Sequence, residues 1–492
     1  MSTFMKVSTA LACFFSVGQS LVQGDANSLL VVDLSYELHR ASTFDTKLGI
    51  YNFSNIRYAV PPLGDLLFRP PQPPASNYSS INDGLDSRIC PQANVGGLIT
   101  SAQWDFSYIT NRTLPNISYS PSPSVGSVPI PRDPRENEGC LFLDVFVPQS
   151  VLNSARTVGT FGFLSGPQFS KSGTPNAGLW DQRLALQWVQ DKTHLFGGDK
   201  MQITVARGSA GAGSIIHQLT AFGGASKVAS SPAQEDQAFN AFLQLANVSS
   251  LGEARAVSSD KLIYANAAQV AGSGYGFFTS GPSRDGTFVP QHPRLLLKDG
   301  KSDKSVSVLV GHNTNEGLAF APPVRDDAGF RELETLKFPN VNQSVIDFIV
   351  NDLYPPIFNG TFGYYEQVGR TAVATTESHF TCAAYALKSA VEKSYGYVFN
   401  TPPALHVADA TYMFYDPSTK SSINTTVAYI LQDYLINFIL HGAPDNRPDG
   451  FSSVPTYGKN ANVVPINANN VTMAKDPAGN ARCKWWEQVL YN

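Results

Sequence analysis

The sequence lacks an excess of charge of either sign, because its 35 lysine and arginine residues nearly balance 39 aspartate and glutamate residues. The formal net charge at pH 7 is only −4. Proteins that bind nucleic acid or acidic membranes need a basic surface. The composition therefore argues against both partners and favours a small, neutral one.

Cysteine is scarce, with five residues in the whole chain, and no pair has the Cys-x-x-Cys spacing. No two histidines have the His-x-x-x-His spacing either. These spacings are typical of zinc sites. The sequence therefore predicts no metal site, and nothing in it indicates an organic cofactor.

Long apolar runs are also missing. The run at residues 7–17 is too short to cross a bilayer. Lys6 precedes it, and small and polar residues follow up to Gly24, which is typical of a signal peptide. We therefore expect a leader over residues 1–24, a secreted mature domain over residues 25–492 and no integral membrane segment.

Two further features favour export to an oxidising compartment. Removal of the leader takes Cys13 with it and leaves an even number of cysteines, which suits disulfides. Nine Asn-x-Ser/Thr sequons are candidate N-glycosylation sites. They are Asn52, Asn77, Asn111, Asn116, Asn247, Asn342, Asn359, Asn424 and Asn470.

The 492 residues could form about three average domains or one large α/β domain. Short apolar runs alternate with helical patterns, which indicates an α/β fold with a mostly parallel sheet flanked by helices. The expected strands are 141–147, 201–206, 307–310 and 395–399. The expected helices are 179–194 and an apolar stripe over 427–439 that ends at Gly442.

Residues 207–213 read Arg-Gly-Ser-Ala-Gly-Ala-Gly and separate an expected strand from an expected helix at 214–219. A serine at such a strand-turn-helix is typical of a nucleophile elbow, in which the helix N-terminus and the Ala210 N–H face a developing oxyanion. Taken alone, the tetrapeptide favours a Gly-Ser-Ala loop without a catalytic role.

A serine nucleophile needs a histidine base, and the base needs an acid. Glu316 directly follows an apolar strand, although a solvated loop carboxylate fits the same pattern. Of the histidines after it, His406 is favoured, since it lies in a loop just beyond a strand. The other histidines are placed less well: His379 within a helix, His441 at a helix end and, before Glu316, His217 eight residues past Ser209.

Several segments together resemble the type-B carboxylesterase and lipase family, which includes cholinesterases and secreted fungal lipases. They are residues 49–51, 56–64, 68–71, 138–145, 161–165, 178–183, 196–199 and 482–486. The resemblance covers nearly all of the expected mature chain and implies an α/β-hydrolase fold.

The resemblance also implies residue roles. Ser209 would be the nucleophile, Glu316 the acid, His406 the base and Ala210 an oxyanion donor. Cys90 and Cys140 match the pair that closes the family's long loop, and Cys382 with Cys483 is expected as a second disulfide.

The sequence departs from the family at two places. The elbow normally reads Gly-Glu-Ser-Ala-Gly, but Arg207 and Gly208 stand at its first two positions, and a long side chain there is expected to crowd the turn. Only residues 149–157 separate Pro148 from Val158, where relatives carry two central strands and a His-Gly-Gly-Gly loop. We therefore expect missing central strands, with residues 155–163 filling part of the gap, and the loss of two oxyanion donors.

These features together predict a secreted serine hydrolase that cleaves small-molecule or lipid carboxylic esters, with its activity impaired by the absent loop. Loss of one oxyanion donor typically costs about 10²–10³ in turnover. The alternatives are a catalytically inactive hydrolase-fold binding protein and a truncated gene product. Neither the choice between esterase and lipase nor the oligomeric state follows from the sequence.

Overall fold

The computed structural model describes residues 21–22, 29–93, 98–112, 133–147, 160–220, 231–418, 422–444, 454–467 and 471–491. The expected leader therefore lies almost entirely outside the described residues. So do residues 148–159, where the expected gap falls.

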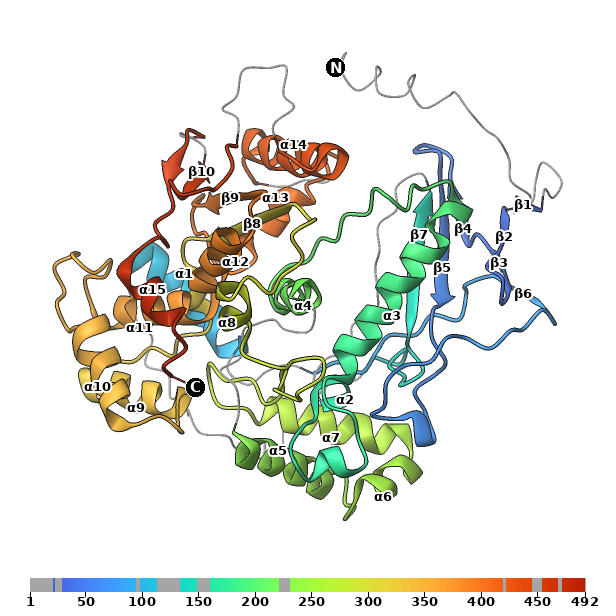
Figure 1. Ribbon diagram of the computed structural model, residues 1–492, viewed down its shortest axis with the longest axis horizontal. Coiled ribbons are helices and arrows are strands. Elements are labelled where there is room, and N and C mark those ends of the chain that lie inside the picture. The colour runs from blue at the N-terminus through green and yellow to red at the C-terminus, as the bar shows by residue number, and fades with distance from the viewer. Residues whose placement is uncertain are drawn as a thin grey trace.

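The secondary structure mixes short strands with many helices (Figure 1). The strands are β1 (Leu21–Val22), β2 (Val31–Asp33), β3 (Leu38–Arg40), β4 (Thr43–Asp45), β5 (Ile50–Arg57), β6 (Ile81–Asn82), β7 (Phe142–Val147), β8 (Val308–Asn313), β9 (Ser394–Phe399), β10 (Asn462–Ile466) and β11 (Ala474–Lys475). The α-helices are α1 (Leu98–Asn111), α2 (Thr160–Phe163), α3 (Ala177–Lys192), α4 (Ala210–Leu219), α5 (Pro232–Leu245), α6 (Leu251–Ala256), α7 (Ser259–Ala271), α8 (Pro293–Lys298), α9 (Asp327–Lys337), α10 (Gln343–Phe348), α11 (Gln367–Thr376), α12 (Cys382–Ala390), α13 (Ala408–Met413), α14 (Thr425–His441) and α15 (Ala481–Trp486).

Most of the expected elements are confirmed. The expected strands at 141–147, 307–310 and 395–399 are β7, β8 and β9, and the two expected helices are α3 and α14. Gly442 ends α14 in the left-handed conformation, with φ of 68°, as a glycine after a helix often does.

The strands of the described chain form separate sheets rather than one continuous sheet. Strands β8, β9 and β10 are parallel neighbours, and β11 is added antiparallel at one edge. Strands β4, β5 and β7 form an antiparallel sheet on the far side of α4 (Figure 1). Both β7 and β8 end their sheets, and no described strand pairs with their outer edges. The described residues are thus consistent with the predicted absence of central strands.

The predicted strand at 201–206 is wrong. Residues 203–208 have no regular secondary structure, and the side chains of Met201 and Val205 are exposed. A strand needs a hydrogen-bonded neighbour, and none of the described strands pairs with this segment. Residues 160–163 form the short helix α2, so this part of the segment expected to fill the gap is helical.

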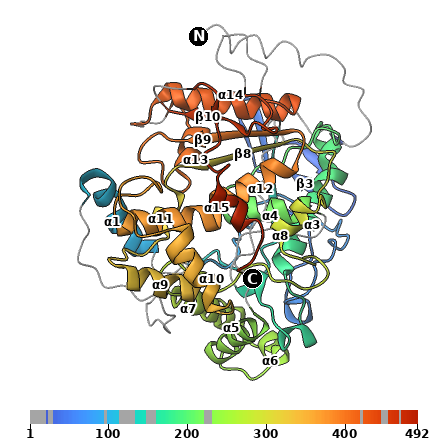
Figure 2. The ribbon, with the colours of Figure 1, turned by 60° about the vertical axis from the view of Figure 1, so that its left-hand side comes forward.

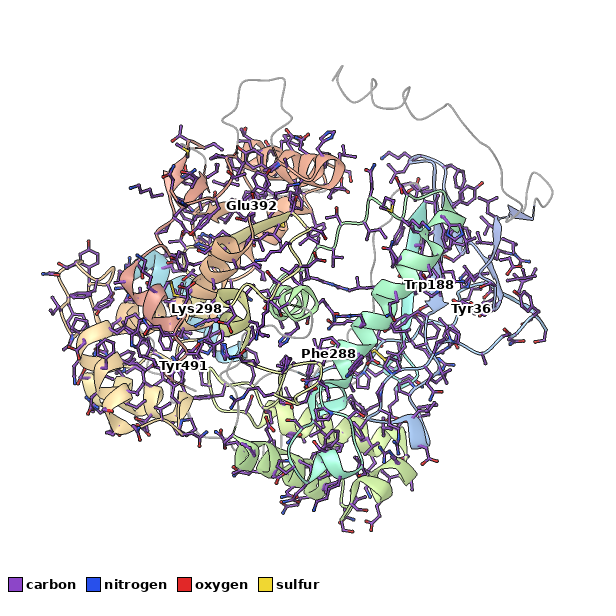
Figure 3. All side chains as sticks on the ribbon, in the orientation of Figure 1. Tyr36, Trp188, Phe288, Lys298, Glu392 and Tyr491 are labelled. Carbon is purple, nitrogen blue, oxygen red and sulfur yellow. A yellow bond between two sulfur atoms is a disulfide. The ribbon has the colours of Figure 1, made fainter. Side chains whose placement is uncertain are left out.

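Each sheet packs against helices. Helix α3 covers the β4–β5–β7 sheet with Trp188, whose indole N–H donates to Tyr36 across a 3.0 Å contact (Figure 3). Helix α14 covers one face of the β8–β9–β10 sheet and α12 the other (Figure 2). The alternation along β9 explains this arrangement, because Tyr395, Tyr397 and Phe399 all face α14.

Two disulfides join Cys90 to Cys140 and Cys382 to Cys483, as predicted. The first closes a loop of 50 residues that contains α1. The second ties α12, which supports β8 and β9, to α15 near the C-terminus.

A buried ion pair lies behind the β8–β9–β10 sheet. Lys388 Nζ of α12 lies 2.7 Å from Asp476 Oδ2, and both side chains are inaccessible to solvent. Tyr457 donates a further hydrogen bond to Asp476 at 3.0 Å. Burial lowers the pKa of Lys388, while the carboxylate of Asp476 opposes that shift.

Replacing Lys388 by Met should lower the free energy of unfolding by about 3–5 kcal/mol, because Asp476 would keep a buried, uncompensated charge. Urea denaturation measures the effect. Arg135→Met is the matched control, since it breaks an exposed ion pair with Asp133 and should cost less than about 1 kcal/mol. Equal losses in the two variants would contradict the prediction.

Candidate active site

Ser209 stands at a sharp turn directly before α4. Its backbone has φ of 55° and ψ of −131°, a conformation that non-glycine residues rarely adopt. Such strain persists only where the surroundings enforce it, and it is common at functional sites. The turn exposes the Ser209 hydroxyl at the N-terminal end of α4, as a nucleophile elbow requires.

The described structure has open space at Gly208 of the elbow, next to Arg207, where crowding was predicted. Arg207 is half-buried, and a Cβ atom added at Gly208 would have no atom within 4 Å.

Glu316 begins the short helical turn η4 (Glu316–Ala319), which follows the end of β8. Gly317 lets this turn approach α11 closely, since a Cβ atom there would lie 2.4 Å from the Ala372 carbonyl oxygen. The Gly317 N–H also donates to the Thr376 hydroxyl at 2.9 Å. These contacts fix the position of Glu316.

His406 lies in the loop that follows β9, the parallel neighbour of β8. The two loops are joined by backbone hydrogen bonds from Thr314 to Phe399 and from Asn315 to Ala404. Parallel pairing therefore brings the side chains after both strands to one edge of the sheet, as the sequence predicted.

The three predicted side chains meet. Ser209 Oγ lies 2.7 Å from His406 Nε2, and His406 Nδ1 is hydrogen-bonded to Glu316 Oε2. An ionised carboxylate can only accept, so Nδ1 carries a hydrogen. In the neutral imidazole, Nε2 is then free to accept from the Ser209 hydroxyl.

The surroundings of Glu316 favour its ionised form. Burial alone would raise its pKa, but the hydrogen bond and charge of His406 and two donors of Asn313 together hold the pKa below its usual value. The Asn313 backbone N–H lies 2.7 Å from Glu316 Oε1, and the side-chain amide lies 3.1 Å from it. Solvent exposure falls from Ser209, which is exposed, to His406 at 13% and Glu316 at 6%.

Two phenylalanines flank the imidazole. The rings of Phe320 and Phe380 each lie 4.9 Å from the His406 ring, between centroids. Phe320 packs edge-on against His406 and also contacts Phe380 at 5.2 Å. This apolar surround restricts the ring orientation of His406 and limits water around it.

Ala210 is the first residue of α4, so its N–H has no partner within the helix. This N–H group follows Ser209 at the N-terminus of α4, where the helix dipole would favour an oxyanion. The loop that carries two further donors in relatives, and that this chain is predicted to lack, would fall at residues 148–159, outside the described part of the chain.

The other histidines lie elsewhere. Burial lowers the pKa of His217 to about 3, and burial with nearby Lys337 and Arg294 lowers that of His379 to about 3. Both therefore lie in surroundings that disfavour a proton, unlike a base that must receive one. Among the described residues, no group of three histidine, cysteine, aspartate or glutamate side chains is placed to hold a metal ion.

Sequence reasoning missed the residues that support the triad geometry. Asp409 accepts from Asn313 at 3.1 Å and from the Tyr397 hydroxyl at 2.7 Å, so one amide links two carboxylates. Two sequence signals could have indicated them: Asn313 lies within the motif around Glu316, and Asp409 lies three residues after His406. No local signal marked Phe320 or Phe380.

Comparison with known proteins decides the family. The model of the carboxylesterase family matches residues 39–158 and 156–486. The chain belongs to the carboxylesterase family. By that membership it is a carboxylic ester hydrolase, and the predicted family is confirmed.

Named relatives of this carboxylesterase span most of its length. It is 35% identical to carboxylesterase patB of Penicillium expansum, covering 95% of this chain and 97% of the relative. It is 28% identical to lipase 2 of Geotrichum candidum over 55% of this chain and 60% of the relative. The structure of Aspergillus niger EstA matches with a TM-score of 0.76 and 22% identity, covering 94% of this chain and 98% of EstA. The predicted α/β-hydrolase fold is confirmed.

The chain is also shorter than the Penicillium expansum relative. The alignment with the Penicillium expansum relative extends over 545 positions, more than the 492 residues of this chain. The relative therefore has segments without a counterpart here. The two matches to the family model meet at residues 156–158, beside the predicted gap.

Replacing Asn313 by Ala should lower kcat by roughly 10–100-fold with little change in KM, because Asn313 orients Glu316 and does not touch the ester. Steady-state kinetics on p-nitrophenyl butyrate measure both. Asn340→Ala is the control, since it removes an exposed hydrogen bond to Gln234 and should leave kcat unchanged. A change confined to KM would assign Asn313 to substrate binding instead.

Proposed function

We propose that Ser209, His406 and Glu316 hydrolyse carboxylic esters through an acyl-enzyme. The observation that carries the proposal is the continuous hydrogen-bonded chain from Ser209 Oγ through His406 to Glu316. Serine, acid and histidine follow one another along the chain in the order of α/β-hydrolases.

The reaction begins when the Ser209 oxygen attacks the acyl carbon and His406 Nε2 takes the hydroxyl proton. Glu316 stabilises the imidazolium that forms. Collapse of the tetrahedral intermediate breaks the ester bond, and His406 returns the proton to the leaving alcohol. Water then attacks the acyl-enzyme in the same way and releases the acid.

Ser209→Ala should abolish hydrolysis of p-nitrophenyl butyrate, because no other group can form the acyl-enzyme. A fluorophosphonate probe should label the wild type at Ser209 and leave this variant unlabelled. Ser214→Ala, one helical turn further along α4, is the control and should keep both activities. If the well-folded wild type resists the probe, the alternative of an inactive binding protein is favoured. The predicted absence of the oxyanion loop is the reason for considering that alternative.

We propose that turnover is reduced because Ala210 is the one oxyanion donor that this chain retains from the family pattern. The family model matches this chain in two parts that meet at residues 156–158, which supports this proposal. Reduced turnover of this kind requires no change in the triad, since the lost segment between Pro148 and Val158 would follow β7.

Inserting the segment of the Penicillium expansum relative that aligns between Pro148 and Val158 should raise kcat by about 10²-fold or more. The added backbone N–H groups would stabilise the oxyanion and not the ground-state ester. Single-turnover measurement of acylation tests this directly. A linker of the same length made of glycine and serine is the control, and an equal gain from that linker would contradict the proposal.

We also propose that the chain is secreted and N-glycosylated. Two disulfides support an oxidising compartment, and the sequons at Asn77, Asn111, Asn247, Asn342 and Asn359 have exposed side chains. By contrast, Asn52 has a buried side-chain oxygen, Asn424 caps α14, and Asn116 and Asn470 lie outside the described residues.

Expression in yeast with the native N-terminus should place the protein in the medium. Enzymatic deglycosylation followed by mass spectrometry should then report conversion to aspartate at the exposed sequons, and none at Asn52, whose side-chain oxygen is buried in β5. Retention inside the cell without glycans would contradict secretion.

A further inference from the structure

A buried carboxyl group with an unsatisfied oxygen lies in the helix that packs beside the triad. Asp105 of α1 is only 4% exposed, and its Oδ1 has no hydrogen-bond partner. Burial raises the pKa of Asp105 to about 7, and no cation contributes to that shift. Unsatisfied buried oxygens are uncommon and require an explanation, such as a ligand that supplies the missing donor.

Helix α1 is held against the loops that carry the triad. Trp104 and Tyr108 pack with Leu318, two residues after Glu316, and with Leu405, which precedes His406. Val368 of α11 completes this cluster, and α1 lies beside α11 (Figure 2). The inner face of α1 therefore borders the triad from the side of η4.

A second set of contacts leads from Asp105 to the same place. Burial, together with the charge of Asp105, raises the pKa of the Tyr275 phenol. This phenol also accepts a hydrogen bond from the Trp104 indole at 3.0 Å. The next residue, Gly276, lies so close to Phe320 that an added Cβ atom would come within 2.5 Å of the Phe320 carbonyl oxygen. Phe320 in turn packs on the His406 ring.

We propose that Asp105 is a specificity-determining residue that accepts a hydrogen bond from a hydroxyl group on the ester substrate. The proposal rests on the proposed ester hydrolysis at Ser209. Two sets of contacts support this role: Trp104, the neighbour of Asp105 in α1, packs in the cluster that includes Leu405, and Tyr275, which feels the charge of Asp105, precedes Gly276, which abuts Phe320. A substrate attached at Ser209 and extending past Phe320 would bring its polar group toward the unsatisfied oxygen.

The chemistry of the surroundings selects a neutral donor. The phenol of Tyr275, which is hydrogen-bonded to the Trp104 indole, interacts with Asp105, and no described lysine, arginine or histidine forms an ion pair with it. A carboxyl group that titrates near neutrality can accept from a hydroxyl when ionised and donate to it when protonated. An alkyl group at this position would leave the oxygen unsatisfied, which is how a polar pocket rejects apolar analogues.

The test uses two matched pairs of esters with the full chain. On the acyl side, p-nitrophenyl 6-hydroxyhexanoate is compared with p-nitrophenyl hexanoate. On the alcohol side, 6-hydroxyhexyl butyrate is compared with hexyl butyrate. We expect kcat/KM to favour the hydroxylated ester by about 10–100-fold in one of the two pairs, the range for a hydrogen bond to a charged group.

Asp105→Leu should remove this preference and keep hydrolysis of the unsubstituted esters, because it replaces an unsatisfied carboxyl group with an apolar side chain of similar size. Asp105→Asn keeps a hydrogen-bonding group and should retain part of the preference. Asp191→Leu, at an exposed position of α3, is the control and should keep the wild-type ratio.

A preference unchanged in Asp105→Leu would overturn the proposal, and so would a wild type that favours neither hydroxylated ester. A stronger preference for 6-aminohexyl butyrate would overturn the choice of a neutral donor. Failure of the proposed function is distinguishable, because the wild type would then hydrolyse none of the esters and Ser209 would not react with the fluorophosphonate probe.

Discussion

Parallel pairing of β8 with β9 is the constraint on which the site depends. It aligns Asn313 with Phe399 at the ends of the two strands and so places the following loops side by side. Glu316 and His406 are 90 residues apart in sequence, yet their positions follow from this single register. A one-residue shift in the register of β8 against β9 would turn the side chains of one strand toward the opposite face of the sheet. The buried Lys388–Asp476 pair and α12 support that register from behind.

Ser209 reaches the same edge by a different route. It is not carried by a strand of the described sheet, since residues 203–208 are irregular. Its position is set by α4, whose buried residue Ile216 packs with Leu387 of α12. The strained backbone of Ser209 thus survives without a neighbouring strand, because the helix that follows is anchored to the same support as β8 and β9.

The sequence was sufficient for features with a local or family signal. Strand ends followed by polar loops located Glu316 and His406, and small residues around a serine located the elbow. The strand at 201–206 was mispredicted because β structure depends on a neighbour that the segment itself does not encode. Asn313 and Asp409 were missed for a related reason, since the bridge between two carboxylates exists only after β8 and β9 pair. The unsatisfied oxygen of Asp105 is likewise visible only after burial.

The divided sheet separates two parts of catalysis that usually occur together. Activation of the nucleophile needs only α4 and the loops after β8 and β9, all of which lie on one side of the elbow (Figure 1). In the proposed function, stabilisation of the oxyanion draws on the segment after β7, where the two matches to the family model meet. A complete hydrogen-bonded triad therefore forms without a described central strand, so the proposed loss of central strands would act on oxyanion stabilisation. Loss of those strands would act on the rate of the chemical step and leave the identity of the reacting groups unchanged.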